Sequence, residues 1–294
     1  MRQLSIKREP DALQFLMALR RGEPDRVPFI ELFLDAEIVE QVLEEPLVPP
    51  GTPDDRAVEE HWKSRLRCLA GLGYDHITVY CGIPFQRRFV AGHDTALYPH
   101  VQRTWQDESR GAIESWKDFE RYPWPRPEDI DYSDIEIVAR HLPEGMTITG
   151  STPGGMLENP MWIMGYVPFS YALYDQPDLV AEIFNRVGEL EVAACEAMAS
   201  HEKVGALIIG DDMGHKHGTL VSAQVIREYA MPWDKRMVEA AHRYDKPYIL
   251  HSCGNLSEIM DDLIDYVGID AKHSYEDVIT PVAEAKRLWG DRIA

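Results

Sequence analysis

The stretch PYILHSCGN, residues 247–255, decides the fold prediction because it joins an apolar strand to a chemically active turn. Its first four residues are apolar or aromatic and predict a short strand, with Pro247 at the position where a sheet loses no hydrogen-bond donor. The closing Gly-Asn pair predicts a turn into a helix that begins near Leu256. Parallel α/β sheets place their chemistry at the carboxyl ends of strands, so we expect a site at this end.

His251 and Cys253 lie at that strand end and are two residues apart in an extended segment, so their side chains point to the same side. An imidazole and a thiol together suit a borderline-soft cation, Zn2+ above all. A catalytic zinc normally takes three protein ligands, so this pair is an incomplete site. In the alternative interpretation, His251 hydrogen-bonds a neighbouring loop and Cys253 is a small buried hydrophobe. The strand-end position favours the metal.

Composition places the chain among soluble globular proteins, with 294 residues, 45% of them hydrophobic and 27% charged. No apolar run reaches the length of a membrane span, and the first twenty residues lack a signal-peptide core, so we expect a cytoplasmic protein without a membrane partner. The formal net charge of −20 does not favour nucleic acid. The four cysteines are few and irregularly spaced, which is typical of free thiols.

Strand-like segments alternate with amphipathic segments of helical period along the whole chain. The expected strands are 27–34, 74–80, 146–150, 204–210, 247–250 and 267–271, and residues 292–294 look like the opening of a seventh. The expected helices are 10–21, 36–45, 57–72, 130–142, 177–201, 222–244, 256–266 and 282–289. Residues 82–124 break this alternation and predict a hairpin insertion, with short strands at 87–90, 96–98 and 101–105, after the second strand.

This order predicts a single α/β domain over residues 1–294: a (β/α)8 TIM-type barrel with helices at its amino terminus that stops after about six to seven β/α units. An open doubly wound sheet is the alternative, but the first strand-to-helix turn has no phosphate-binding fingerprint, and polar residues follow several strands. A barrel without its last units would expose a parallel edge, so we expect a truncated copy or one completed from elsewhere.

A second polar cluster follows the strand of residues 204–210, where Asp211, Asp212, His215 and Lys216 occur within six residues. Neighbouring side chains of an extended segment point apart, so only one of the two aspartates is expected to face the barrel mouth. We assign Asp212 to catalysis and the other three to substrate binding. Alternatively, one acid caps the next helix and the histidines are exposed.

Two glutamates complete the candidate set. Glu158 precedes the apolar residues 161–164 and is a candidate catalytic acid or base, although it could equally be a residue at a helix start. Glu31 interrupts the apolar run of residues 27–34, so its carboxylate either pairs with Arg26 or a loop donor or lines a substrate site.

Four segments carry a resemblance to a known family: GDDMGHKHG (210–218), VSAQVIREYAMPWDKR (221–236), PYILHSCGN (247–255) and DDLIDYVGIDAKH (261–273). They resemble the uroporphyrinogen decarboxylase superfamily, which contains haem-pathway decarboxylases and zinc-dependent, corrinoid-linked methyltransferases. The similarity extends from about Pro24 to the last residue and is strongest after Gly210.

The resemblance implies that His251 and Cys253 match the zinc-binding H-x-C pair of the methyltransferases, whose distant second cysteine would lie beyond residue 294. Asp212 or Glu158 would then be a fourth ligand or a group that supports the ligands. It further implies a corrinoid (cobalamin) on a partner protein and a small methyl donor or acceptor, namely a thiol, a methoxy compound or a methylamine. A homodimer is a further possibility.

The decarboxylase branch fits the sequence less well. Its members carry an M-R-Q-A-G-R segment at the end of the first strand and an aspartate at the end of the second, where this chain has residues 30–35 (IELFLD) and 80–82 (YCG). Uroporphyrinogen III decarboxylation in porphyrin biosynthesis therefore remains the alternative function. An inactive, truncated binding subunit is the second alternative.

Overall fold

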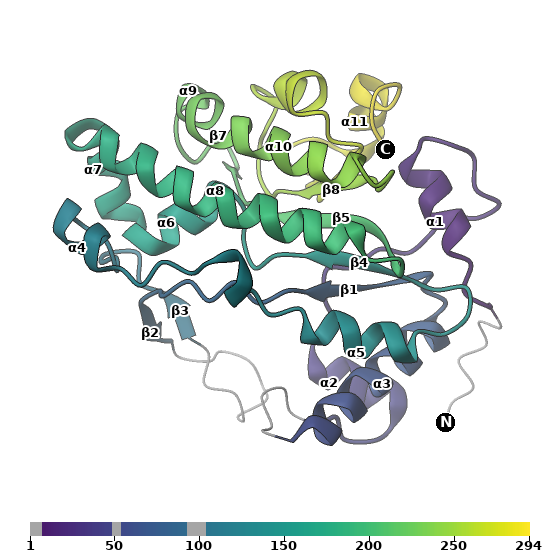
Figure 1. Ribbon diagram of the computed structural model, residues 1–294. Helices are drawn as coiled ribbons and strands as arrows, with labels where there is room; N and C mark the ends of the chain where they lie inside the picture. Colours follow the sequence, from purple (N-terminus) through teal and green to yellow (C-terminus); the bar gives the residue numbers. More distant parts are fainter. Residues whose placement is uncertain (1–7, 49–53, 93–103) are drawn as a thin grey trace.

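A parallel five-stranded sheet forms the centre of the computed structural model, which describes residues 8–48, 54–92 and 104–294 (Figure 1). The strands are β1 (His76–Tyr80), β4 (Thr147–Ser151), β5 (Val204–Gly210), β8 (Tyr248–His251) and β9 (Ala271–His273), in the spatial order β1-β4-β5-β8-β9. Sequence order and spatial order coincide, as expected when each strand returns through a helix to the next position of a barrel wall.

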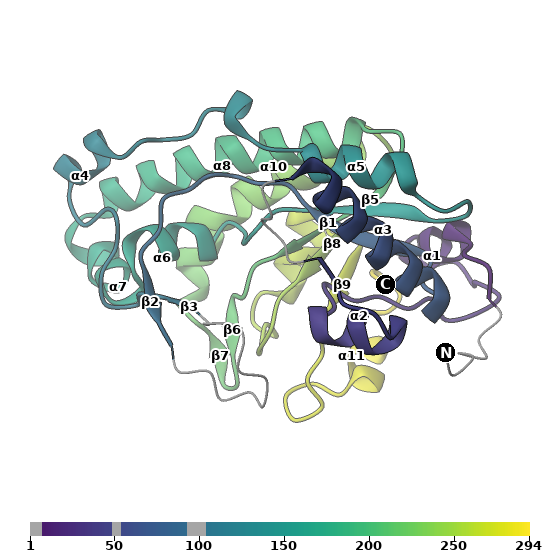
Figure 2. The ribbon, with the colours of Figure 1, turned by 90° about the horizontal axis from the view of Figure 1, so that it is seen from below.

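Helices supply the second layer (Figures 1 and 2). They are α1 (Ala12–Leu19), α2 (Ala36–Leu43), α3 (Asp55–Leu72), α4 (Trp116–Arg121), α5 (Ser133–His141), α6 (Glu158–Met164), α7 (Tyr166–Asp175), α8 (Pro177–Ser200), α9 (Ala223–Val225), α10 (Met231–His242) and α11 (Val282–Trp289). Short turns of other helix types occur at η1 (Pro127–Asp129), η2 (Ile226–Ala230) and η3 (Asp262–Val267). Within the described ranges, no helix combines the length and apolar character needed to cross a membrane.

The two faces of the sheet have different cores, as β5 shows. Leu207 and Ile209 belong to the large cluster built with α8 and α10, whereas Ala206 and Ile208 face a smaller cluster that contains Phe15 of α1. All four are buried, which explains why this strand is apolar throughout rather than alternating.

Four of the six expected strands are confirmed, the sixth is displaced along the chain, and the first is wrong. Residues 27–34 form no strand; they run beside β1, and Thr78 Oγ1 donates a hydrogen bond to the Glu31 carbonyl at 3.0 Å in place of a backbone ladder. Pro28 has no N–H to donate, and Val27 and Phe33 are 80% and 67% exposed, so this run has no ladder and only its alternate residues Ile30, Leu32 and Leu34 pack against the core.

The sixth strand is displaced along the chain from its expected position. The helix before it continues through Val267 and ends at Gly268, whose φ of 87° needs a glycine, so β9 begins only at Ala271. Residues 292–294 are not a strand, although the Ala294 N–H donates to the Asp270 carbonyl at 2.9 Å and the Ala294 carbonyl accepts from Lys272 N–H at 3.1 Å. Across the part of the chain that the structure describes, the sheet is not closed into a barrel.

The expected hairpin insertion is present as β2 (Phe89–Ala91) paired antiparallel with β3 (Thr104–Gln106). The short strand expected at residues 96–98 lies outside the described residues.

A buried ion pair joins the amino-terminal segment to the sheet. Asp75, just before β1, accepts two hydrogen bonds from the Arg26 guanidinium and one from the backbone N–H of Asp11, the residue that caps α1. The Asp75 side chain is fully buried. Its two oxygens therefore position both α1 and residues 25–26 against β1.

We predict that Asp75→Ala lowers the free energy of unfolding by about 3 kcal/mol, because it leaves the guanidinium of Arg26 without its partner in a largely buried position. Denaturant unfolding at neutral pH measures the change. Arg20→Ala is the control: Arg20 pairs with Asp245 at the surface, and its loss is expected to cost less than about 1 kcal/mol. Equal effects of the two substitutions would contradict the structural role of Asp75.

Candidate metal centre

The register between β5 and β8 brings two separate strand ends together. Gly210 is paired with His251, and the next N–H, of Asp211, donates to the His251 carbonyl at 2.9 Å. One residue further on, Asp212 Oδ1 accepts the backbone N–H of Cys253 at 2.8 Å. Side chains 212, 251 and 253 therefore share the carboxyl end of the sheet.

The side chains of Asp212, His251 and Cys253 direct their ligand atoms toward one point. His251 Nε2 lies 3.6 Å from Cys253 Sγ and 3.7 Å from Asp212 Oδ1, and all three ligand atoms lie within 4.8 Å of one another. Bond lengths of about 2.0–2.1 Å to nitrogen or oxygen and about 2.3 Å to sulfur give N···S and N···O separations of about 3.6 and about 3.3 Å in a tetrahedral zinc site. The observed spacing fits zinc with three protein ligands and one open position.

His273 fixes the orientation of the imidazole. It is the β9 residue paired with His251, and the two Nδ1 atoms share a hydrogen bond of 2.7 Å, which leaves His251 Nε2 facing Cys253 and Asp212. A hydrogen bond on the other ring nitrogen is the usual support of a metal-bound histidine. Burial lowers the pKa of His251, so its ring is neutral at pH 7, the form that binds a metal.

The turn after Cys253 packs closely against a neighbouring hairpin. Gly254 has a φ of 81°, and a Cβ at this position would lie 2.2 Å from the carbonyl carbon of Gly214, so only glycine fits. The N–H of Gly254 donates to Glu276 Oε1 at 2.9 Å. Burial raises the pKa of the Cys253 thiol, so without a metal it stays protonated at pH 7.

The buried amine of Lys272 joins the loop that follows β8 to the loop that follows β9. Lys272 Nζ donates to the carbonyls of Ser252 at 3.1 Å, His273 at 3.5 Å and Ser274. Ser274 has a φ of 76°, a strained value for a residue other than glycine, and its hydroxyl lies 3.7 Å from Cys253 Sγ. Burial lowers the pKa of Lys272 to about 8. The amine therefore fixes the backbone on both sides of Cys253 by hydrogen bonds to carbonyl groups of the two loops.

Asp211 and Asp212 diverge, as their adjacent positions in an extended segment require. Asp211 is buried and its carboxylate accepts the N–H groups of Leu157 at 2.9 Å and Glu158 at 2.8 Å, the first turn of α6. Gly155 allows this approach, since a Cβ there would lie 2.4 Å from the Cβ of Asp211. The observed role of Asp211 is to cap α6, and its predicted contact with substrate stays untested.

Glu158 stands at the start of α6, near Asp212. Burial, followed by the charges of Asp211 and Asp212, raises the pKa of Glu158 to about 9, so its carboxyl is protonated at neutral pH. A neutral carboxyl beside the metal-ligand group donates rather than accepts a proton. Its catalytic role stays a prediction.

The remaining three predicted residues lie away from the three ligands. His215 and Lys216 are exposed on the hairpin of β6 (Gly214–His215) and β7 (Gly218–Thr219), which contacts the site loop through the Asn255 N–H bonded to the His215 carbonyl at 2.9 Å. Glu31 lines a separate cavity beside β1, and Arg26, its expected partner, pairs with Asp75 instead.

The sequence analysis missed a buried polar chain behind α6. Arg87 of the insertion donates to Asn159, and Asn159 Nδ2 donates to Glu191 Oε1 at 2.8 Å. Burial raises the pKa of Glu191 to about 8. A signal was available, because Glu191 follows Val187 by four positions and therefore shares the apolar face of α8.

We predict that Glu191→Gln flattens the pH dependence of stability. Because the folded-state pKa is raised from 4.5 to about 8, the folded protein holds a proton that the unfolded chain releases, and stability falls as pH rises from about 5 to 8. Denaturant unfolding at several pH values measures the slope, which should be smaller in the variant. Glu189→Gln, an exposed position of the same helix, is the control and should keep the wild-type slope. An unchanged slope in Glu191→Gln would contradict the assignment.

Comparison with known proteins identifies the family to which this chain belongs and supports its fold. Curated proteins give no match. The solved structure of a methyltransferase from Methanosarcina mazei is similar, with a TM-score of 0.64 and 16% sequence identity over 95% of this chain and 80% of that one. At this identity the likeness establishes the fold. The sequence profile of the uroporphyrinogen decarboxylase (URO-D) family matches residues 109–292, more than half of the chain. The chain therefore belongs to the uroporphyrinogen decarboxylase family.

Proposed function

We propose that this member of the family is a zinc-dependent methyltransferase that moves a methyl group between a corrinoid on a partner protein and a small thiol, methoxy or methylamine substrate. The observation that carries the proposal is the convergence of His251 Nε2, Cys253 Sγ and Asp212 Oδ1 at one point of the sheet's carboxyl end. The similar fold of the Methanosarcina mazei methyltransferase supports it.

The three ligands would hold the ion and leave its fourth position toward substrate. Zinc, when bound, would lower the pKa of a coordinated thiol and keep it as a thiolate at neutral pH. Asp212 would serve twice, since the Oδ1 atom near His251 Nε2 also accepts the Cys253 N–H and fixes the loop. His273 holds the imidazole of His251 through its Nδ1 atom, and Lys272 holds the loop after β8 through the Ser252 carbonyl.

Glu158 would act as a hydrogen-bond or proton donor at the same mouth, because its carboxyl is protonated at neutral pH. A donor there can neutralise charge on a leaving group of a methoxy or methylamine substrate. Apolar side chains on the insertion provide a surface for a corrinoid protein: Phe89 and Trp105 are exposed on β2 and β3.

Porphyrinogen decarboxylation is the second candidate, since the family profile carries that description. A substrate with many carboxylates needs a basic pocket. Here the mouth holds Asp212, Glu158 and Glu276, and the nearby Lys272 amine already donates to three carbonyl groups. The charge of the site therefore favours methyl transfer.

We predict about one zinc per chain in protein purified from zinc-replete cells, measured by plasma mass spectrometry, and loss of that zinc in His251→Ala and Cys253→Ala. Asp212→Asn keeps an acceptor for the Cys253 N–H but loses the charge, so its zinc affinity should fall at least tenfold. His217→Ala is the control, because His217 lies exposed on the β6–β7 hairpin; it should keep full zinc. Zinc content that survives the loss of His251 and of Cys253 would contradict the site.

We also predict transfer of the methyl group of methylcobalamin to a small thiol such as 2-mercaptoethanol, monitored by the cobalamin spectrum. Cys253→Ala should lower the rate on the order of a hundredfold or more, because several kcal/mol of charge stabilisation is lost with the ion. Porphyrinogen turnover by metal-free protein, with no thiol methylation, would instead establish the decarboxylase alternative. Zinc binding without either activity would support the binding-subunit alternative.

A further inference from the structure

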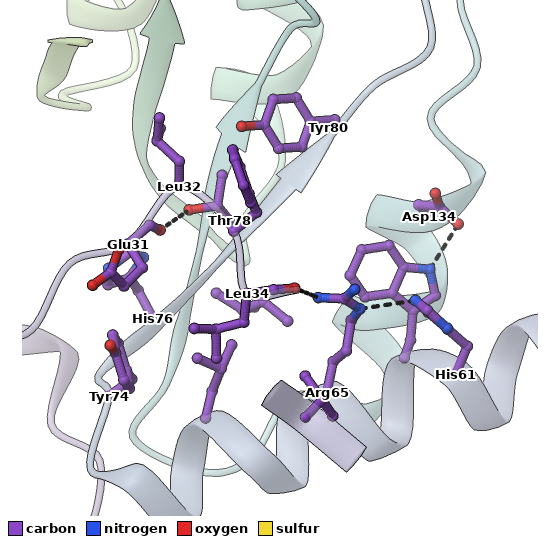
Figure 3. A pocket seen from close by; sticks show the side chains of 15 residues that line it. Glu31, Leu32, Leu34, His61, Arg65, Tyr74, His76, Thr78, Tyr80 and Asp134 are labelled. Carbon is purple, nitrogen blue, oxygen red and sulfur yellow. Dashed lines mark hydrogen bonds between the residues drawn. The ribbon is translucent and has the colours of Figure 1, made fainter. Parts of the chain in front are cut away.

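The cavity that Glu31 lines is at the β1 edge of the sheet, away from the candidate metal ligands at the ends of β5 and β8. It is bounded by α2, α3, β1 and residues 31–34 and has a volume of about 270 Å3 (Figure 3). Its described lining includes none of the three candidate metal ligands. The cavity is therefore a separate site within the fold.

One end of the cavity carries a half-buried cation, Arg65, whose hydrogen bonds go to neutral groups. Arg65 Nε donates to His61 Nε2 at 2.8 Å, and Arg65 Nη1 donates to the Leu34 carbonyl at 3.0 Å, so both acceptors are neutral. Asp134, the acid beside this end, is bonded to Trp62 Nε1 at 2.8 Å. Among the described residues Arg65 forms no ion pair; burial lowers its pKa, and the charge of Asp35, which is not in contact with it, opposes that shift. An anion in the cavity would replace the hydration that the guanidinium has lost.

The body of the cavity is apolar. Leu32, Leu34, Val39, Leu69 and Ile77 contribute to its wall. A cavity of roughly 150 Å3 lined by apolar side chains accepts benzene, so about 270 Å3 provides room for one ring and a carboxylate. An inorganic anion would leave this apolar wall without contacts.

A second orphaned group lines the same space. His76 is buried, its ring is stacked on Phe15 and its Nδ1 is bonded to Thr149 Oγ1 at 2.9 Å, but its Nε2 has no hydrogen-bond partner. The Phe29 carbonyl interacts with the ring and raises the pKa of His76 against the larger lowering by burial, but its geometry falls short of a full hydrogen bond to Nε2. Buried polar atoms without a partner are rare in native proteins, so His76 points to a ligand or a bound water here.

The opposite end limits the charge of the ligand. Glu31 lies there, apart from Arg65, with Tyr74 and His76 beside it (Figure 3). Its carboxylate would repel a second negative charge, which favours a monoanion. We propose that the cavity binds a small monocarboxylic acid with an apolar, ring-sized body, held by an ion pair between its carboxylate and Arg65.

Titration calorimetry with benzoate and with benzamide, its neutral isostere, tests the proposal on the whole chain. Benzoate should bind wild-type protein at least tenfold more tightly than benzamide, since only benzoate pairs with Arg65. Arg65→Gln should abolish this preference. Arg67→Gln is the matched control: Arg67 is exposed two positions along α3 and pairs with Glu45, and its loss should leave both affinities unchanged.

Equal affinity for benzoate and benzamide, no binding of benzoate at millimolar concentration, or an unchanged preference in Arg65→Gln would each overturn the proposal. The comparison of the two ligands on wild-type protein decides the matter even if Arg65→Gln does not fold. Binding is measured without metal or methyl donor, so the outcome is independent of the proposed methyl transfer.

Discussion

The backbone register between β5 and β8 is the constraint on which the candidate metal centre depends. With Gly210 paired to His251, the two strands end side by side, and the next residues of each, Asp212 and Cys253, meet through a hydrogen bond of 2.8 Å. A shift of either strand by one residue would turn its side chains to the other face and separate the three ligand atoms. The buried apolar residues of both strands prevent such a shift, because each would have to leave its own core.

Burial keeps most of the titratable groups around Cys253 neutral. Burial lowers the pKa of His251 and His273 and raises the pKa of Cys253 and Glu158, so these groups are neutral at pH 7. A buried group stays neutral when nothing compensates the cost of its charge. In the proposed metal centre a divalent ion would supply that compensation and stabilise Cys253 as a thiolate.

Much of this arrangement could be predicted from the sequence. The strand before His251 and the period-two alternation of side chains predicted that His251 and Cys253 face the same way, and the same alternation predicted that only one of Asp211 and Asp212 faces the site. The predictions that failed depended on contacts between residues that are far apart in the sequence. Residues 27–34 have the apolar character of a strand, but they run beside β1 without a backbone ladder, and only alternate residues of the run pack against the core.

Local sequence patterns also could not predict the residues that support the three candidate ligands and the helix α6. His273 reaches His251 through the register between β8 and β9, and β9 lies further along the chain than its apolar pattern indicates. The chain from Arg87 to Glu191 links three segments that are far apart in sequence, and no local pattern shows that they meet. Long-range packing decided these positions.

X-ray absorption at the zinc edge of the loaded protein tests the central claim most directly, because it reports the atoms bound to the ion itself. The convergence of Asp212, His251 and Cys253 predicts one sulfur at about 2.3 Å together with nitrogen and oxygen at about 2.0–2.2 Å, including the outer scattering of one imidazole. A spectrum with no sulfur neighbour, or without the imidazole signal, would show that the ion is held elsewhere and would contradict the account.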